Sequence, residues 1–565
     1  MQDNKFFIYQ ILTRLFGNSV SKNKFNGTIE ENGCGKFNDI TDDLLIKIKE
    51  SGYTHVWYIG ILAHASTTDY TAYGIPEEFP EIIKGKAGSP YAVRDYFDVD
   101  PDLAVDIPNR MSEFEDLITR THKAGLKVII DNVPNHVARN YQSVSKPIGI
   151  EDFGERDDTS IAFSAQNNFY YLPGQPLNLQ LSPDKMINFS YNESPAKVTG
   201  NDCFTNAPTQ FDWYETVKLN YGVDYMNGNR SQFTPLPDTW GKMRDILIFW
   251  AEKEVDGFRC DMAEMVPLEF WHWVVPQVKA RFPEIIFMAE IYNPSAYRDF
   301  IKYNTFDYLY DKVGLYDVLR DVACGYRPSS DISFTLNSVG DIQDRMLNFM
   351  ENHDEQRIAS DYFLKDGDMG KSAMILTCSI NTNPVMIYAG QELGEKGMDE
   401  EGYSGKNGRT SIYDYWSADT LHRWNNNGKW NSKRLTKKEK DLKDFYSRLI
   451  KVCKEENSIS GGLFYDLMPA NYENIEFDST RLFAFLRSHE KELLLVVVNF
   501  DHEVKNCTIH IPHHAYSFLG IEDTGEGKLT PLLNNEEDEL LFTYDYPFRI
   551  KLNSHEGEIY RISFL

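Results

Sequence analysis

The sequence predicts a parallel (β/α)8 barrel with one inserted domain, followed by a C-terminal antiparallel β domain. Up to residue 456, short apolar runs alternate with amphipathic stretches, which is the pattern of an α/β protein. Four of the apolar runs end in charged residues, as barrel strands do where they reach an active site. A doubly wound sheet would need a Gly-rich phosphate turn after the first strand, and the sequence has none there.

Eight strands and six of the connecting helices can be assigned in order. The strands are rich in Val, Ile, Phe and Met: Phe6–Leu12, His55–Ile61, Lys127–Val133, Gly257–Met262, Ile285–Ile291, Phe306–Leu309, Met346–Met350 and Pro384–Ala389. The amphipathic stretches between and after them are Asp42–Ser51, Arg110–Ala124, Thr239–Glu254, Pro267–Phe282, Lys371–Asn381 and Lys437–Glu455. Some end on Gly and a basic residue, as in Thr121–Lys127, which is typical of a helix stop before a strand.

Two further regions depart from the alternation. Residues 137–237, after the third strand, are rich in Asn, Pro and aromatic residues, and a structureless loop of that length is improbable in a compact domain. Short strands with polar turns follow residue 457, and they are Arg481–Arg487, Glu492–Asn499, Cys507–Ile511 and Glu558–Phe564. We therefore predict a catalytic barrel at residues 1–136 and 238–456, an inserted domain at 137–237 and an antiparallel β-sandwich domain at 457–565.

The charge and the cysteine pattern exclude several classes of protein. The 565 residues include 58 Lys and Arg against 85 Asp and Glu, a net charge of -27 that disfavours nucleic acid and anionic membranes as partners. Seven cysteines without a C-x-x-C pair predict free thiols and no zinc site. No apolar run approaches the length of a membrane span, and the first residues lack a basic signal-peptide region, so we expect a cytoplasmic protein.

Four segments carry the candidate chemistry. Each is a predicted barrel strand that continues into a loop bearing Asp, Glu, His or Arg: Lys127–His136, Val255–Met265, Ile285–Tyr292 and Leu347–Arg357. The carboxyl ends of the strands of a parallel barrel meet at one face, so these side chains are expected to converge. The sequence therefore predicts one acidic active site at that face.

Three carboxylates at these strand ends are suited to splitting a glycosidic bond. Asp261 lies two residues after Arg259 on the same strand face, so the guanidinium should lower the pKa of the carboxyl and keep it ionised. Glu290 ends an apolar strand, where desolvation should raise its pKa and favour a general acid. Two carboxyl groups with divergent pKa values are what glycoside hydrolysis requires, and Asp354 supplies a third.

The ordered set of segments resembles the α-amylase family, glycoside hydrolase family 13. The four signature regions of that family are matched in order by Asp131–His136, Gly257–Asp261, Ala289–Glu290 and Asn352–Asp354. Tyr91–Tyr96 is similar to a block whose Tyr forms a platform under the sugar, and Thr216–Asn220 to a motif near the end of the inserted domain. Each motif is short, but the ordered set is highly specific.

The resemblance implies a retaining mechanism and assigns roles to residues. Asp261 would be the nucleophile, Glu290 the general acid and base, and Asp354 would stabilise the oxocarbenium-like state. Retention predicts the Asp261 and Glu290 carboxyl groups about 5–5.5 Å apart. The supporting residues would be Tyr91 as the platform, His136 and His353 on sugar hydroxyls, Arg259 orienting Asp261, and Asp131 bracing Arg259.

The expected substrate is an oligosaccharide or polysaccharide α-glucan that the enzyme hydrolyses. An α-glucan transglycosylase or phosphorolytic relative is the nearest alternative, and a non-catalytic carbohydrate-binding relative is the other class. We expect no required cofactor, because the segment Glu31–Gly35 is short of the carboxylates found in the family's calcium cluster; Asn135 is the candidate ligand for a structural calcium. Aromatic residues of the insert are candidate acceptor subsites, and Gly390–Trp416 is expected to shape substrate choice. The aromatic candidates are Phe169, Tyr170, Tyr171, Trp213 and Tyr214.

Overall fold

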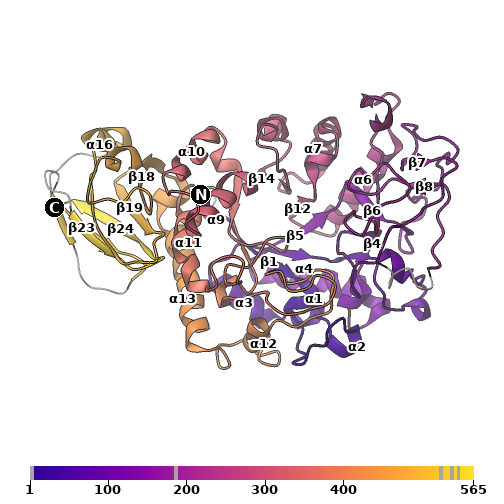
Figure 1. Cartoon of the computed structure of the whole chain (residues 1–565), viewed down its shortest axis with the longest axis horizontal. Coiled ribbons are helices and arrows are strands. Elements are labelled where there is room, and N and C mark those ends of the chain that lie inside the picture. The colour runs from indigo at the N-terminus through magenta and orange to yellow at the C-terminus, as the bar shows by residue number, and fades with distance from the viewer. Residues whose placement is uncertain (1–4, 183–188, 521–525, 535–539, 544–547, 565) are drawn as a thin grey trace.

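A closed barrel of eight parallel strands forms the centre of the molecule. The computed structural model describes residues 5–182, 189–520, 526–534, 540–543 and 548–564 (Figure 1). The barrel strands are paired in chain order and close on themselves, which confirms the predicted fold class. They are β1 (Phe7–Leu12), β2 (His55–Ile59), β5 (Lys127–Asn132), β12 (Gly257–Cys260), β13 (Ile286–Ala289), β14 (Tyr308–Tyr310), β15 (Met346–Phe349) and β16 (Val385–Tyr388).

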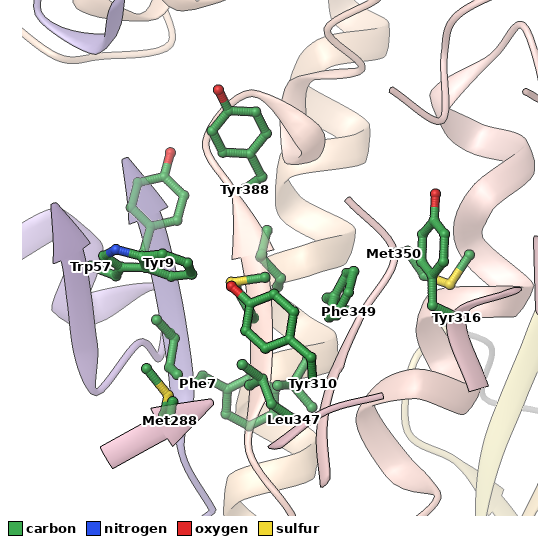
Figure 2. Close-up of a cluster of buried hydrophobic side chains, with 14 of the residues drawn as sticks. Phe7, Tyr9, Trp57, Met288, Tyr310, Tyr316, Leu347, Phe349, Met350 and Tyr388 are labelled. Carbon is green, nitrogen blue, oxygen red and sulfur yellow. The ribbon is translucent and has the colours of Figure 1, made fainter. Parts of the chain in front are cut away.

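The barrel interior and the packing behind it are filled by large apolar side chains. Figure 2 shows this cluster, in which Trp57, Met288, Tyr310 and Leu347 come from four different strands. All four are fully buried, so the barrel is a packed core and has no pore through it. This rigid base fixes the strand ends from which the charged side chains project.

Helices cover the outside of the barrel, and all six predicted ones are present within about two residues at each end. They are α3 (Asp42–Glu50), α4 (Arg110–Lys123), α6 (Asp238–Glu252), α7 (Leu268–Arg281), α11 (Lys371–Ser379) and α13 (Lys437–Glu455). The remaining helices are shorter: α1 (Thr13–Phe16), α2 (Ile29–Asn32), α8 (Tyr297–Ile301), α9 (Asp317–Ala323), α10 (Asp331–Ser338), α12 (Asp419–Asn425), α14 (Asn457–Gly461), α15 (Met468–Asn471) and α16 (His513–Leu519). These helices have four to eight residues, too few for a clear helical period, so the sequence did not show them.

Two long connections with strands of their own rise from the described barrel, whereas the sequence predicted one. The predicted insert follows β5 and contains three small sheets, in which β6 (His136–Ala138) pairs with β9 (Thr216–Lys218), β7 (Tyr171–Leu172) with β8 (Ala196–Lys197), and β10 (Val223–Asp224) with β11 (Arg230–Ser231). The second connection lies between β2 and α4 and contains the antiparallel pair of β3 (Leu62–His64) and β4 (Val93–Val99). Because β3 has only three residues, it gives no period-2 pattern, and the sequence did not show this strand pair.

The C-terminal region is an antiparallel β structure, as predicted. Its six-stranded sheet has the order β17 (Leu463–Asp466), β18 (Leu482–His489), β19 (Glu492–Asn499), β24 (Gly557–Phe564), β21 (Glu526–Pro531) and β22 (Leu540–Thr543). A separate two-stranded sheet pairs β20 (Lys505–Ile509) with β23 (Phe548–Leu552). This region and the insert lie at opposite ends of the long axis (Figure 1). Within the described ranges, no helix is long and apolar enough to cross a membrane.

Candidate active site

The carboxylates of interest leave neighbouring barrel strands at the same level. In the parallel ladder Arg259 of β12 is paired with Asp131 of β5, so their side chains lie next to each other. Just beyond the strand ends, the Asp261 N–H donates to the Asn132 carbonyl at 2.9 Å and the Glu290 N–H to the Cys260 carbonyl at 3.1 Å. The backbone pairing therefore brings Asp261 and Glu290 together, although they are far apart in the sequence.

Arg259 is the centre of the charge network. Its Nη1 lies 2.8 Å from Asp261 Oδ1 and 3.2 Å from Asp131 Oδ1, and its Nη2 lies 2.7 Å from Glu290 Oε2. The guanidinium is fully buried, with its carbon 5.4–5.5 Å from the ring centres of Trp57, Tyr91 and Tyr310. Burial acts to lower the pKa of Arg259, but Glu290 and the other acidic groups raise it, so the cation persists.

The predicted environment of Glu290 was wrong. Glu290 is 3% exposed, but its surroundings are polar as well as apolar, because Oε2 accepts from the Met262 N–H at 2.8 Å in addition to its ion pair with Arg259. Oε1 accepts from the Tyr292 hydroxyl at 2.5 Å. The local run of apolar residues could not show Arg259 and Met262, since they come from the neighbouring strand β12 and the loop that follows it.

The predicted net direction of the Asp261 pKa was also wrong, although Arg259 acts on it in the predicted direction. Burial raises the pKa of Asp261 well above its usual range, and nearby Glu290, Asp131 and Asp354 raise it further. The Arg259 guanidinium acts in the opposite direction but is shared with Glu290 and Asp131. A nearby Arg always acts to lower a carboxyl pKa, but burial and the neighbouring carboxylates decide the net direction.

Asp354 lies across the site on the loop after β15. Its Oδ2 is 3.0 Å from His353 Nε2, and the carboxylate is partly exposed to the cavity. Desolvation acts to raise its pKa, but His353, Arg259 and Arg409 outweigh it and lower the pKa to about 2. His353 is held by Gln10 at 3.2 Å and by the Tyr91 hydroxyl, and its ring stacks on Tyr91 at 5.3 Å.

The other predicted site residues lie at the same face. His136 is on β6, where its ring is 5.2 Å from that of Trp213. Burial, then Lys218 and Lys84, lower the pKa of His136 to about 3, so its ring is neutral and suited to hydrogen bonding with hydroxyl groups. Asp131 contacts Arg259 and also accepts from Trp57 Nε1 at 3.1 Å. The expected brace contact is therefore present.

Asn135 does not fit the metal role considered for it. Its Oδ1 accepts from the Lys218 ammonium at 2.8 Å, and its Nδ2 donates to the Gly200 carbonyl at 2.8 Å. Lys218 is buried and also pairs with Asp202 at 2.6 Å. A calcium ion would need several oxygens at the place where this ammonium already lies. In the part of the chain that is described, no group of three or more acidic, His or Cys residues could hold a metal ion.

The carboxylates face a cavity of about 290 Å³. Its walls come from the barrel, from both long connections and from the loop after β16: Lys84, Ser89, Tyr91, His136, Trp213, Glu215, Thr216, Asp261, Met262, Glu290, Tyr292, Asp354, Ile412 and Tyr413. The segment 390–416 thus contributes to the site through its last residues. Of the five aromatic candidates in the insert, only Trp213 lines this cavity, and the other four are buried.

Sequence reasoning gave no role to Ser89, Tyr292, Lys84 or Glu215 of these walls. Tyr292 could have been found, because it lies two residues after Glu290 and shares its side of the chain. Lys84 and Glu215 could not, because they are charged residues in irregular segments, where charged side chains are usually solvated.

Comparison with known proteins decides the family. The family described as "Alpha amylase, catalytic domain" matches residues 10–462. The chain belongs to the α-amylase family. Alpha-amylase 2 of Dictyoglomus thermophilum is 22% identical over 430 residues, covering 74% of this chain and 60% of the relative. Alpha-amylase MalA of Haloarcula japonica is 22% identical over 507 residues, covering 88% and 55%.

The α-amylase fold extends over the whole chain. The crystal structure of an α-amylase from Geobacillus thermoleovorans in complex with acarbose aligns with a TM-score of 0.63 at 18% identity, covering 100% of this chain and 98% of that one. This likeness concerns the fold alone. The chain spans about 55–60% of the length of the two curated relatives it matches.

Proposed function

We propose that the protein is a retaining α-glycoside hydrolase that acts on α-glucans through a covalent glycosyl-enzyme intermediate. The observation that carries the proposal is the sharing of one buried guanidinium by Asp261 and Glu290 at the floor of a cavity. Two carboxyl groups that pair with the two amino groups of one guanidinium lie close together, which supports a retaining pair over an inverting one, whose carboxyl groups are further apart.

In the first step, Asp261 attacks the anomeric carbon of the sugar held over Tyr91. The bond between that carbon and the glycosidic oxygen breaks, and Glu290 donates its proton to the leaving oxygen. The Tyr292 hydroxyl and the Met262 N–H fix both oxygens of Glu290, so its carboxyl group has a defined orientation for the transfer. Asp354 lies across the cavity, where its negative charge favours the oxocarbenium-like state.

In the second step, Glu290 takes a proton from a water that attacks the same carbon, and the ester to Asp261 is released. The glucan leaves with its original anomeric configuration. His136 lines the cavity and serves as a hydrogen-bonding partner for a hydroxyl group of the reacting sugar. The role expected for His353 does not fit, because its ring nitrogens are already bonded to Gln10, Tyr91 and Asp354; His353 instead positions Tyr91 and Asp354, and Arg259 keeps the carboxylates in position.

The charges in the cavity favour hydrolysis of a neutral sugar over phosphorolysis, in which a phosphate ion would have to enter. Among the residues that line the described cavity, Lys84 is the only Lys or Arg, and it pairs with Glu215 at 3.0 Å. An incoming phosphate would face Asp261, Glu290 and Asp354 without a free cation to bind it. Hydrolysis and transfer to a second glucan share the same intermediate, and the products distinguish them.

The first experiment is a time course on maltotetraose with pullulan alongside, resolved by chromatography. We expect only shorter sugars from maltotetraose, whereas products longer than the input would show transglycosylation. Asp261→Asn should lower turnover by at least about 10³-fold, because it removes the nucleophile.

The matched control is Asp419→Asn, which makes the same change at an exposed carboxylate 82% accessible on α12. It should turn over maltotetraose at the wild-type rate. Full activity in Asp261→Asn, or an inverted product by NMR, would contradict the mechanism.

A further inference from the structure

A buried ion pair lines the catalytic cavity and has no part in the mechanism above. Lys84, in the connection between β2 and β4, and Glu215, in the insert just before β9, lie with Nζ and Oε1 3.0 Å apart. Their side chains are 9% and 5% exposed. Buried ion pairs contribute little net stability, because desolvation costs about as much as the attraction gains. Stability alone therefore does not account for the pair.

Both members have unused hydrogen-bonding capacity. The structure gives Glu215 Oε2 no hydrogen-bond partner among the described residues, although it is buried. The ammonium of Lys84 has three donors, and besides Glu215 its described contact is the face of Tyr214 at 5.4 Å. An unsatisfied buried carboxylate oxygen is costly unless a ligand completes it.

The backbone on both sides of the pair is fixed. The Ala87 N–H donates to the Tyr413 carbonyl at 3.0 Å, which ties the Lys84 segment to the loop after β16. The Arg139 N–H donates to the Glu215 carbonyl at 2.9 Å, which ties Glu215 to the insert. The two side chains are therefore held in position before any ligand arrives, which lowers the entropy cost of binding one.

The chemistry of the pair fits two neighbouring hydroxyl groups of a sugar. One hydroxyl can donate to Glu215 Oε2 and the next can accept from Lys84 Nζ. The pair is neutral overall, so it favours an uncharged ring over a sugar phosphate, whose charge Glu215 would repel.

The position of the pair selects the glycon side of the cavity. Glu290, which must reach the leaving oxygen, contacts Tyr292 and Met262. Glu215 lies beside the insert strand that carries His136, because Thr216, the next residue, pairs with Ala138 in the β6–β9 ladder. His136 faces the reacting sugar, and Glu215 lies further along the insert ladder than His136, so we place the pair at the next glucose unit on the glycon side. In the described part of the chain Lys84 pairs with Glu215 and with none of the three catalytic carboxylates.

We propose that Lys84 and Glu215 form a clamp that binds the hydroxyl groups of the glucose unit next to the reacting one, on its non-reducing side. This inference rests on the proposed function. The clamp makes the enzyme depend on at least two glucose units on the glycon side of the bond that is cut.

The test compares 4-nitrophenyl α-maltoside, which places two glucose units on the glycon side, with 4-nitrophenyl α-glucoside, which places one there. Lys84→Met and Glu215→Gln should each lower kcat/KM for the maltoside about tenfold or more, mainly through KM, since each removes a charged hydrogen bond. The glucoside should be affected less than twofold. The fold-decrease in kcat/KM of the double variant should be smaller than the product of the two single fold-decreases, because the two groups act as one unit.

The control is a Lys–Glu pair of the insert that does not line the cavity. Lys146 and Glu155 are 3.3 Å apart, and Lys146→Met and Glu155→Gln should leave kcat/KM for both substrates unchanged. Titration calorimetry of maltotriose into a Glu290→Gln background should show the same tenfold weakening from the clamp variants, without relying on turnover.

The outcomes separate the inference from the proposed function. Equal losses on both substrates would place the pair on the reacting sugar and overturn the clamp, as would unchanged maltoside kinetics. Wild-type protein that cleaves neither aryl glycosides nor maltotetraose would overturn the proposed function itself.

Discussion

Arg259 shows how one side chain organises the site. A single buried guanidinium contacts Asp131, Asp261 and Glu290, and aromatic rings enclose it. Removing it would leave these carboxylates in a desolvated cavity with only their mutual repulsion, so Arg259 is needed for the fold of the site as well as for its chemistry.

Lys218 has a comparable role in the insert. Its ammonium joins Asn135 to Asp202 across the β6–β9 pair, and the ring of Tyr225 lies 5.3 Å from it. We propose that this lysine supplies the positive charge that a structural calcium would otherwise bring to Asn135.

Chelation tests this proposal. Excess EDTA should leave the melting temperature and the activity unchanged, whereas Lys218→Met should lower the free energy of unfolding by about 1–3 kcal/mol, because the Asn135 and Asp202 oxygens lose their donor. Added calcium should not restore the variant, since two side chains cannot complete its coordination. A fall in the wild-type melting temperature with EDTA would contradict the proposal.

At the scale of elements, capping residues in the sequence mark where a helix begins. Helix α13 begins with a capping box, in which the Glu439 N–H donates to the Thr436 hydroxyl at 3.2 Å and the Thr436 N–H to Glu439 Oε2 at 2.7 Å. This box fixes the start of the longest helix, which packs against the loop after β16 and against α11 and α14.

Thr436→Ala should lower the free energy of unfolding by about 1 kcal/mol without changing kcat/KM, because the cap lies away from the cavity. Urea unfolding measures the change. Thr119→Ala is the matched control, since Thr119 is exposed in the interior of α4, where Ala is the better helix former. Equal destabilisation by both variants would show that the cap contributes nothing.

At the scale of the whole molecule, burial of titratable groups couples stability to pH. Burial lowers the pKa of His55, at the start of β2, from 6.5 to about 4. The folded state therefore binds fewer protons than the unfolded state between these values, and stability falls as the pH drops from about 6.5 to about 4.

His55→Gln should give a flatter dependence of unfolding free energy on pH over this window. The wild-type contribution is at most about 3 kcal/mol across it. Urea unfolding at pH 7 and at pH 4.5 measures the difference. His122→Gln serves as the opposing control, because the hydrogen bond to Asp256 raises the pKa of His122, and that contribution is lost as the pH rises. Parallel curves for wild type and His55→Gln would contradict the prediction.

The sequence alone determined the barrel, the order of its strands and the identity of the acidic residues at its carboxyl face. Apolar runs and helical periods are local patterns, and they recur here at eight strands and six long helices with little ambiguity. The strand ends that carry Asp261, Glu290 and Asp354 converge because parallel barrel strands all finish at one face.

The tertiary structure decided what surrounds those residues. Sequence reasoning gave Arg259 to Asp261 alone and placed Glu290 in an apolar setting, but the register of neighbouring strands lets one guanidinium serve both. Sequence reasoning could not predict the contact between Lys84 and Glu215 either, since they lie 131 positions apart in segments without helical or strand periodicity. A charged group interacts with charges on every element packed around it. The sequence pattern shows only the charges that lie on the same strand or helix.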